Sequence, residues 1–71
     1  MEMEIIDMYD NGTLTKEQLK ESGIENPENC VKVIYKENNI IKEIYLDLEY
    51  SIYNYTDSEI INLILEAKEL W

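Results

Sequence analysis

The sequence predicts a small α+β domain: two short N-terminal helices, an antiparallel β-hairpin or three-stranded meander, and one C-terminal amphipathic helix packed on the sheet. Two observations carry this prediction. Residues 30–55 alternate between apolar and polar positions, as half-buried strands do, and the flanking segments carry helix-capping patterns. A chain of 71 residues forms a single domain, which divides into a helical part at 1–24, the sheet at 30–55 and a helix at 57–71.

Residues 2–10 are predicted to form the first short helix. Ile5, Met8 and Tyr9 share one helical face by their spacing, and Asn11-Gly12 follows as a stop signal. So short a helix is marginal in isolation, so packing against the rest of the domain must hold it.

A second helix is predicted over 16–22 because both of its ends are marked. Thr15 and Gln18 form a capping-box pattern, and Gly23 stands where a left-handed residue ends a helix. The segment 7–18 also matches part of a calcium-binding EF-hand loop, but Gln18 stands where that loop needs a bidentate glutamate. We therefore expect a connector between helices rather than a metal site, and no cofactor.

Residues 30–47 are predicted to form a β-hairpin centred on Asn38-Asn39. Asparagine tolerates the positive φ that a type I′ turn requires. This turn puts one apolar face and one mixed polar face on the hairpin, which is the consistency expected of a real register. The expected partners on the apolar face are Val31 with Leu46, Val33 with Ile44, and Tyr35 with Lys42.

Beyond the hairpin, residues 48–55 are expected to continue as a strand that bends near 49–51. They form a third strand of a meander, or an edge open to strand addition and homodimerisation. Even-numbered side chains are assigned to the core and odd-numbered ones to solvent, because successive strand residues alternate between faces. The predicted core face is Ile44, Leu46, Leu48, Tyr50 and Ile52.

Residues 57–71 carry a strong helix pattern. Thr56 and Glu59 form a capping box, and Asp57 lies at the positive end of the helix dipole. A broad apolar stripe follows, which we expect to cover the even-numbered face of the hairpin. Its members are Ile60, Leu63, Ile64, Ala67, Leu70 and Trp71.

Charge is the most unusual bulk feature. The chain has 16 acidic residues and 6 basic ones, all lysine, with no histidine, for a net charge of −10. Direct binding to nucleic acid or to an anionic membrane is disfavoured, because a protein needs cationic side chains to bind either of them. A basic protein partner is favoured, although acidic composition alone also keeps a small protein soluble. The excess lies at the two ends, 1–15 and 43–71, while 16–42 is neutral.

Cellular location is predicted from what the chain lacks. Cys30 is the single cysteine, so an internal disulfide cannot form, and a free thiol is ordinary in the cytoplasm. The acidic N-terminus lacks the positive charge of a secretory signal, and no apolar run is long enough to span a membrane. We expect a cytoplasmic protein.

Catalysis is not predicted. Histidine is absent, so no side chain with an ordinary pKa near neutrality is present for acid–base work. Cys30 has no histidine beside which it could act as a nucleophile, and the two glycines both serve helix ends rather than a phosphate loop. We therefore expect a protein that is not an enzyme and that acts by binding another protein.

The candidate binding surface is the outward, odd-numbered face of 43–55, where carboxylates and tyrosines interleave. Carboxylates on one strand face recur about every 6.8 Å, close to the phosphate spacing of a nucleic-acid strand. Tyrosine is enriched in protein interfaces, although the same residues also suit a solvated strand. The predicted partner-binding residues are Glu43, Tyr45, Asp47, Glu49, Tyr53 and Tyr55, aided by Glu2, Glu4, Asp7 and Asp10.

The short, acidic chain, rich in Ile, Asn, Lys, Glu and Tyr, resembles the small inhibitor proteins of phages and mobile elements, of the anti-CRISPR and anti-restriction type. That resemblance is one of class. It implies a nucleic-acid mimic that occupies the basic groove of a bacterial defence or DNA/RNA-processing enzyme, in the host cytoplasm if the chain is phage-encoded. The alternative is a structural or regulatory module that homodimerises through a sheet edge or an apolar patch.

Overall fold

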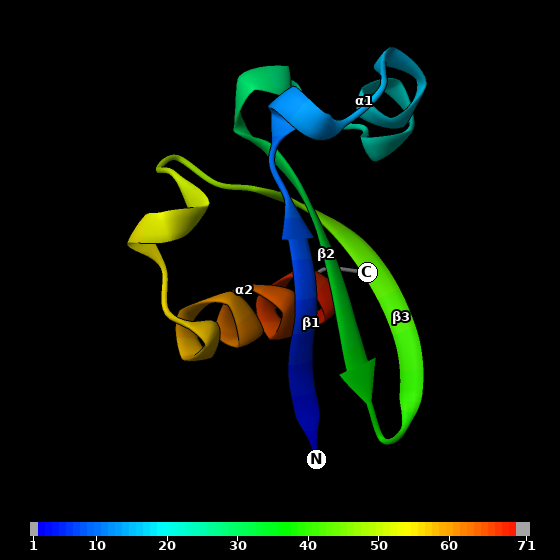
Figure 1. Ribbon diagram of the computed structural model, residues 1–71, viewed down its shortest axis with the longest axis vertical. Helices are drawn as coiled ribbons and strands as arrows, with labels where there is room; N and C mark the ends of the chain where they lie inside the picture. Colours follow the sequence, from blue (N-terminus) through cyan, green and yellow to red (C-terminus); the bar gives the residue numbers. More distant parts are fainter. Residues whose placement is uncertain (1, 70–71) are drawn as a thin grey trace.

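The computed structural model describes residues 2–69 as a three-stranded antiparallel sheet with a helix across one face (Figure 1). The strand order is β1-β2-β3, so β2 is central and the other two strands are edges. A second, shorter helix lies at one end of the sheet (Figure 1). The elements are β1 (Met3–Tyr9), α1 (Lys16–Ser22), β2 (Cys30–Glu37), β3 (Ile40–Asp47) and α2 (Asp57–Glu69), with 3-10 turns η1 (Asn11–Thr13), η2 (Pro27–Asn29) and η3 (Ile52–Asn54).

The predicted fold class is wrong in the order of its elements, because the chain begins with a strand. β1 replaces the helix expected over 2–10 and pairs with β2. The pairing register shifts between Ile5 and Asp7, as it does when a β-bulge inserts one extra residue. Met3 and Ile5 face the core before the bulge and Met8 faces it after. The step of three from Ile5 to Met8 imitates helical spacing, which explains the error.

The hairpin register is confirmed. Val33 lies opposite Ile44, and the pairing runs from Cys30 with Asp47 to Glu37 with Ile40. Both turn residues adopt the left-handed backbone, with φ of 50° at Asn38 and 69° at Asn39. Two positive φ values in a two-residue loop give the twist that matches the strands on either side.

The strand expected over 48–55 does not form. β3 ends at Asp47, the Leu48 amide donates to the Asn29 carbonyl at 2.9 Å, and the chain then turns into η3. Ser51 starts that turn by accepting a bond from the Tyr53 amide. The predicted core face therefore ends early: Leu48 is buried, whereas Tyr50 is 65% exposed.

The prediction for α1 is confirmed at both ends. The Thr15 hydroxyl accepts from the Gln18 amide at 3.1 Å, and the Gln18 side chain accepts from the Thr15 amide at 2.9 Å. Gly23 ends the helix with φ of 71°, a conformation that glycine adopts without the steric cost of a Cβ.

The core lies between the sheet and α2. Ile60 and Ile64 are fully buried, and so is Val33 of the central strand. Thr56 and Glu59 exchange capping bonds at the start of α2, which satisfy two of the amides left free at a helix N-terminus. Two members of the predicted apolar stripe, Leu70 and Trp71, lie outside the described residues, as does Met1.

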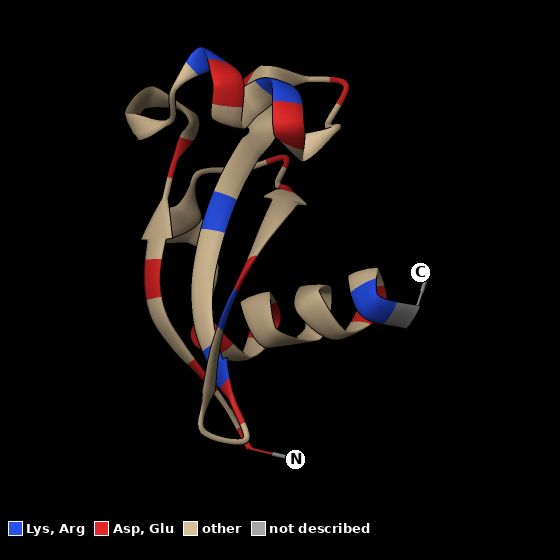
Figure 2. Cartoon of the chain, turned by 90° about the vertical axis from the view of Figure 1, so that its right-hand side faces the viewer, with Lys and Arg blue, Asp and Glu red and all other residues tan. Residues whose placement is uncertain are grey.

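The sheet therefore has two unlike faces. α2 covers one of them, and in Figure 2 the helix stands on that side alone. We call the other the open face. Its side chains are Glu4, Asp7 and Tyr9 from β1, Lys32, Ile34 and Lys36 from β2, and Ile41, Glu43, Tyr45 and Asp47 from β3.

Candidate functional site

The predicted partner-binding residues are divided by the structure. Glu43, Tyr45 and Asp47 lie together on the open face at the β3 edge. Tyr55 is half-buried and packs against the core, and Tyr53 lies on η3 with 88% of its surface exposed. The predicted row is broken because the strand that was to carry its second half ends at Asp47.

One more predicted residue lies at a separate hollow. Glu49 follows β3 and lines a hollow of about 240 Å³ together with Asp10 of the η1 cap and Glu28 of η2. The lining contains three carboxylates and no lysine. This hollow shares the acidic character of the open face without being part of it.

β1 supplies the open-face residues that the sequence interpretation placed on a helix. Pairing with β2 sets Glu4 opposite Lys36, Asp7 opposite Ile34 and Tyr9 opposite Lys32. The acid-rich first segment, assigned to a helix, thereby joins the acid-rich hairpin on one surface. The alternation of Met3, Glu4 and Ile5 was the signal that could have shown this.

Two cross-strand rows define the centre of the open face. One runs Tyr9, Lys32, Tyr45, so a lysine stands between two phenol rings. The next runs Asp7, Ile34, Glu43, so an isoleucine stands between two carboxylates. Directly opposed residues are close enough in an antiparallel sheet for their side chains to interact.

Lys32 is neutralised within the face. Its ammonium lies 3.0 Å from a Glu43 carboxylate oxygen. The hydrogen bond to Glu43 raises the pKa of Lys32 above its ordinary value, against the lowering effect of desolvation. This lysine is therefore charged near neutral pH but compensated. The open face carries four carboxylates against two lysines, Lys32 and Lys36, so its net charge is negative.

The pKa of Tyr9 responds to the negative charge of the open face. The Asp7 carboxylate raises the pKa of the Tyr9 phenol, first by accepting a hydrogen bond from it and then by its negative charge, with only a smaller opposing effect from Lys32. The phenol stays protonated, and its one hydrogen is directed to Asp7. The same electrostatic environment favours a cation brought to the ring.

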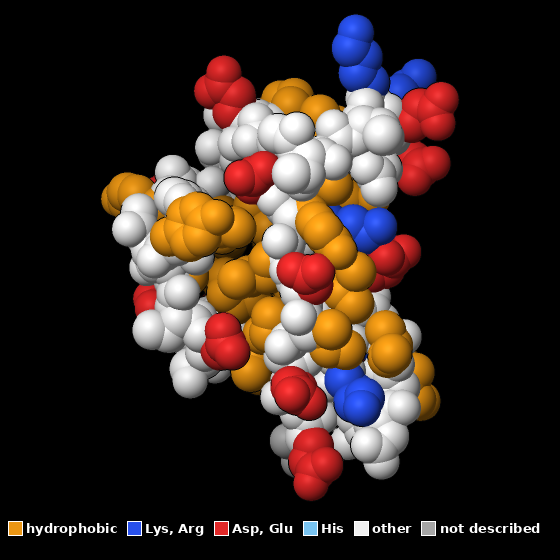
Figure 3. All heavy atoms as spheres, in the orientation of Figure 1, with side chains coloured by type: hydrophobic (Ala, Val, Ile, Leu, Met, Phe, Trp, Pro, Cys, Tyr) orange, Lys and Arg blue, Asp and Glu red, His pale blue; other side chains and the backbone are white. Residues whose placement is uncertain are grey.

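A hollow of about 310 Å³ lies where the open face meets the end of the molecule that carries α1. It brings the Tyr9 ring and the Ile34 side chain of the sheet together with Gln18 in the first turn of α1. Figure 3 shows apolar side chains running down this side of the sheet with carboxylates on both sides of them. The lining residues are Tyr9, Thr13, Leu14, Gln18, Lys32 and Ile34.

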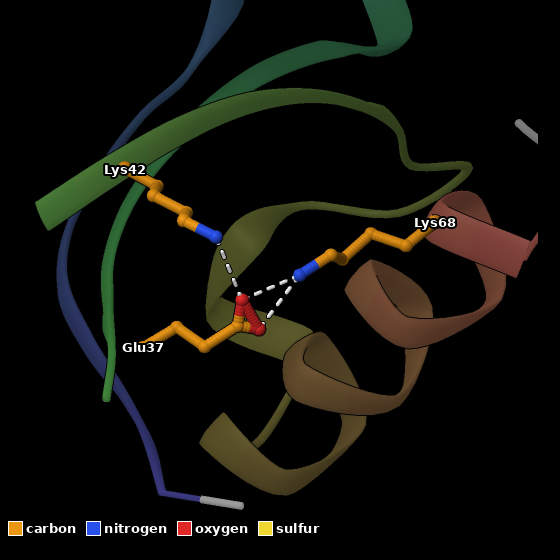
Figure 4. A network of polar contacts seen from close by, with 3 residues as sticks. All are labelled: Glu37, Lys42 and Lys68. Carbon is orange, nitrogen blue, oxygen red and sulfur yellow. Dashed lines mark hydrogen bonds and ion pairs between the residues drawn. The ribbon is translucent and has the colours of Figure 1, made fainter. Parts of the chain in front are cut away.

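A second cluster of charges lies on the covered face, where Glu37 accepts hydrogen bonds from Lys42 of β3 and Lys68 of α2 (Figure 4). Glu37 is only 6% exposed. The Lys68 bond, and then the Lys42 bond, hold the pKa of Glu37 below its ordinary value, and Glu37 in turn raises the pKa of Lys68. Since a buried charge needs partners, the cluster is structural: it ties two strands to the helix.

These pairs also determine which charges remain for binding. Lys32, Lys42 and Lys68 are engaged in ion pairs, and Lys16 and Lys20 lie on α1 at one end of the fold (Figure 2). The sixth lysine, Lys36, lies on the open face opposite Glu4. The carboxylates of Glu4, Asp7 and Asp47 are exposed and take no part in these three ion pairs.

The described residues offer little for other chemistry. No group of three or more His, Cys, Asp and Glu side chains within 2–69 is arranged to hold a metal ion. Cys30 is completely buried. Neither α1 nor α2, as described, has the length and apolar character to cross a membrane.

Comparison with protein-family models, with curated proteins and with solved structures finds no match to this chain.

Proposed function

We propose that this chain is a non-catalytic protein-binding domain that inhibits a nucleic-acid-processing enzyme by occupying its basic groove with the open face. The observation that carries the proposal is the meeting of two acid-rich segments on one uncovered sheet surface around tyrosines and isoleucines.

The spacing of the acids supports a fit to a phosphate-binding surface. β1 and β3 flank β2 at the usual strand separation, so their side chains form two acidic rows roughly 10 Å apart. Glu4 and Asp7 lie on one row, and Asp47 and the Lys32-paired Glu43 on the other, with Lys32 and Lys36 of β2 between them. Lysines and arginines placed to contact phosphates can contact such rows instead.

The middle of the open face supports a protein partner rather than a free cation. Ile41 is 65% exposed and Tyr9 38% exposed, with Ile34 and Tyr45 half-buried between the strands. An apolar and aromatic centre with a charged rim is the usual composition of a protein interface. Binding of free cations would not require the apolar centre of the open face.

The proposal is tested by nuclease inhibition. Purified CRISPR effector nucleases and restriction enzymes are assayed for DNA cleavage with and without an equimolar to tenfold excess of the protein. We expect stoichiometric inhibition of at least one enzyme, with inhibition weakened when NaCl is raised from about 0.1 to 0.5 M, because surface charge attraction is screened over a few ångströms at high salt.

A matched pair of variants assigns the effect to the open face. The triple variant Glu4→Gln, Asp7→Asn, Asp47→Asn removes three exposed charges from that face, whereas Glu21→Gln, Glu25→Gln, Glu66→Gln removes three exposed charges elsewhere. We expect the first to lose inhibition and the second to keep it. Equal loss in both, or inhibition that salt leaves unchanged, contradicts the proposal.

A further inference from the structure

The geometry points to a specific mode of binding: the free edge of β3 accepts an extended segment of the partner as a fourth, antiparallel strand, in which basic and apolar residues alternate. This inference rests on the proposed function in one respect, the basic character of the partner.

The β3 edge has an unused row of backbone groups. Within the described residues β3 pairs with β2 and with no other strand. In an antiparallel ladder, alternate residues direct their N–H and C=O groups to the same neighbour. The two-residue turn makes Glu37 and Ile40 the first bonded pair, so Ile41, Glu43, Tyr45 and Asp47 direct theirs outward.

The opposite edge is protected, and β3 is not. β1 carries the bulge near Ile6, and Asp7 occupies the Met8 amide there with a bond of 2.9 Å. Bulges are one of the devices by which proteins block edge pairing. β3 runs in unbroken register over all eight residues and contains no proline. Its first two residues, Ile40 and Ile41, are 59% and 65% exposed.

The side chains that accompany the free backbone groups define the partner. They are the open-face residues of β3, which alternate apolar or aromatic with acidic: Ile41, Glu43, Tyr45, Asp47. Directly opposite side chains in an added strand lie within contact distance. The complementary strand therefore has lysine or arginine facing Glu43 and Asp47, and apolar residues facing Ile41 and Tyr45.

A second copy of this chain fits the edge less well. Each copy has a net charge of −10, and pairing β3 with itself centred on Glu43 or on Tyr45 sets acidic residues opposite one another. Pairing centred on Ile44 sets each acid opposite an apolar or aromatic residue and gives neither acid a cation. Like charges directly opposed across strands are destabilising. A basic strand supplies the complementary charge that a second copy lacks.

The probe is the heptapeptide Lys-Thr-Val-Thr-Lys-Thr-Val, labelled with a fluorophore and titrated with the intact protein by fluorescence anisotropy. Its first and fifth residues face Asp47 and Glu43 in the proposed register. Two further peptides carry N-methyl groups, one on the third and fifth residues, whose amides point at β3, and one on the fourth and sixth, whose amides point away.

We expect the parent peptide and the peptide methylated at the fourth and sixth residues to bind alike. Methylation at the third and fifth residues is expected to weaken binding by about tenfold, because it removes two backbone bonds. The scrambled peptide Lys-Lys-Val-Val-Thr-Thr-Thr is also expected to bind about tenfold more weakly. Equal binding of both methylated peptides, or equal binding of the scrambled one, overturns the inference, because attraction of charge alone would give that result.

Variants of the protein give an independent reading. Tyr45→Pro removes the outward amide while leaving the bonds to β2 in place, as edge prolines do, and Tyr45→Thr removes the same ring but keeps the amide. We expect only the proline variant to lose affinity for the parent peptide. Sedimentation at the titration concentration must show a monomer. A dimer would assign the edge to a second copy and overturn the inference.

The outcomes separate this inference from the proposed function. If Tyr45→Pro still inhibits an enzyme in a salt-sensitive way, the open face remains the proposed inhibitory surface and strand addition is contradicted. Edge-dependent peptide binding without inhibition of any enzyme in the panel keeps strand addition and contradicts the inhibitor proposal.

Discussion

The two faces of β2 alternate residue by residue and yet have opposite environments. Val31, Val33 and Tyr35 point toward α2 and are buried, whereas Lys32 and Ile34, their immediate neighbours, lie on the open face and are half-buried. Because the strand period is two, one backbone serves both faces. This difference shows that the side chains buried against α2 stabilise the fold, while the open face remains accessible to solvent.

The largest expected effect comes from the covered face. Ile64→Ala removes a fully buried side chain of α2, and such truncations cost about 2–5 kcal/mol of unfolding free energy, a large share of the stability of a small domain. Urea denaturation followed by circular dichroism measures it. Ile41→Ala on the open face, at a residue 65% exposed, is the control and should cost less than about 0.5 kcal/mol. Similar costs for both would remove the distinction between the faces.

The next effect concerns pH and the cluster around Glu37. Ion pairs with Lys68 and Lys42 lower the pKa of Glu37 in the folded state, so their stabilisation is complete above the ordinary glutamate pKa of about 4.3. It is lost as pH falls through the lowered value. Glu37→Gln should therefore be less stable than the wild type at pH 7 and should approach it in acid.

Urea midpoints at several pH values between neutral and strongly acidic measure this convergence. Glu66→Gln, at an exposed position of α2, is the control for loss of one negative charge and should show no such convergence. A gap between wild type and Glu37→Gln that stays constant on acidification would contradict the role given to the cluster.

The elements that could be predicted from the sequence are those whose stabilising interactions join residues close together in the chain. The hairpin and α1 are set by neighbours close in the chain: Asn38-Asn39 defines the register, and Thr15 with Gln18 defines the helix start. β1 depends on a partner strand far along the chain, with a bulge that disguises its period. Local patterns carry no signal of that pairing.

The candidate site shows the same limit. Glu43, Tyr45 and Asp47 were predicted because they lie on the hairpin, whose register is local. Glu4, Asp7 and Tyr9 could be placed with them only once β1 was known to be a strand. The burial of Glu37 could not be predicted either. Its carboxylate is stabilised on the covered face by Lys68, which comes from the last turn of α2, far along the chain.

The smallest expected effect is a change in titration without a change in stability. Asp7 raises the pKa of Tyr9 through a hydrogen bond and its charge, so Asp7→Asn should lower that pKa toward the ordinary tyrosine value of about 10. Ultraviolet absorbance titrations of each protein with and without Tyr9→Phe isolate the one phenol among six tyrosines. The asparagine oxygen can still accept the Met8 amide bond, so the urea midpoint should stay near that of the wild type. A marked loss of stability would mean that the charge of Asp7 helps hold the bulge, and the open face would then share in folding after all.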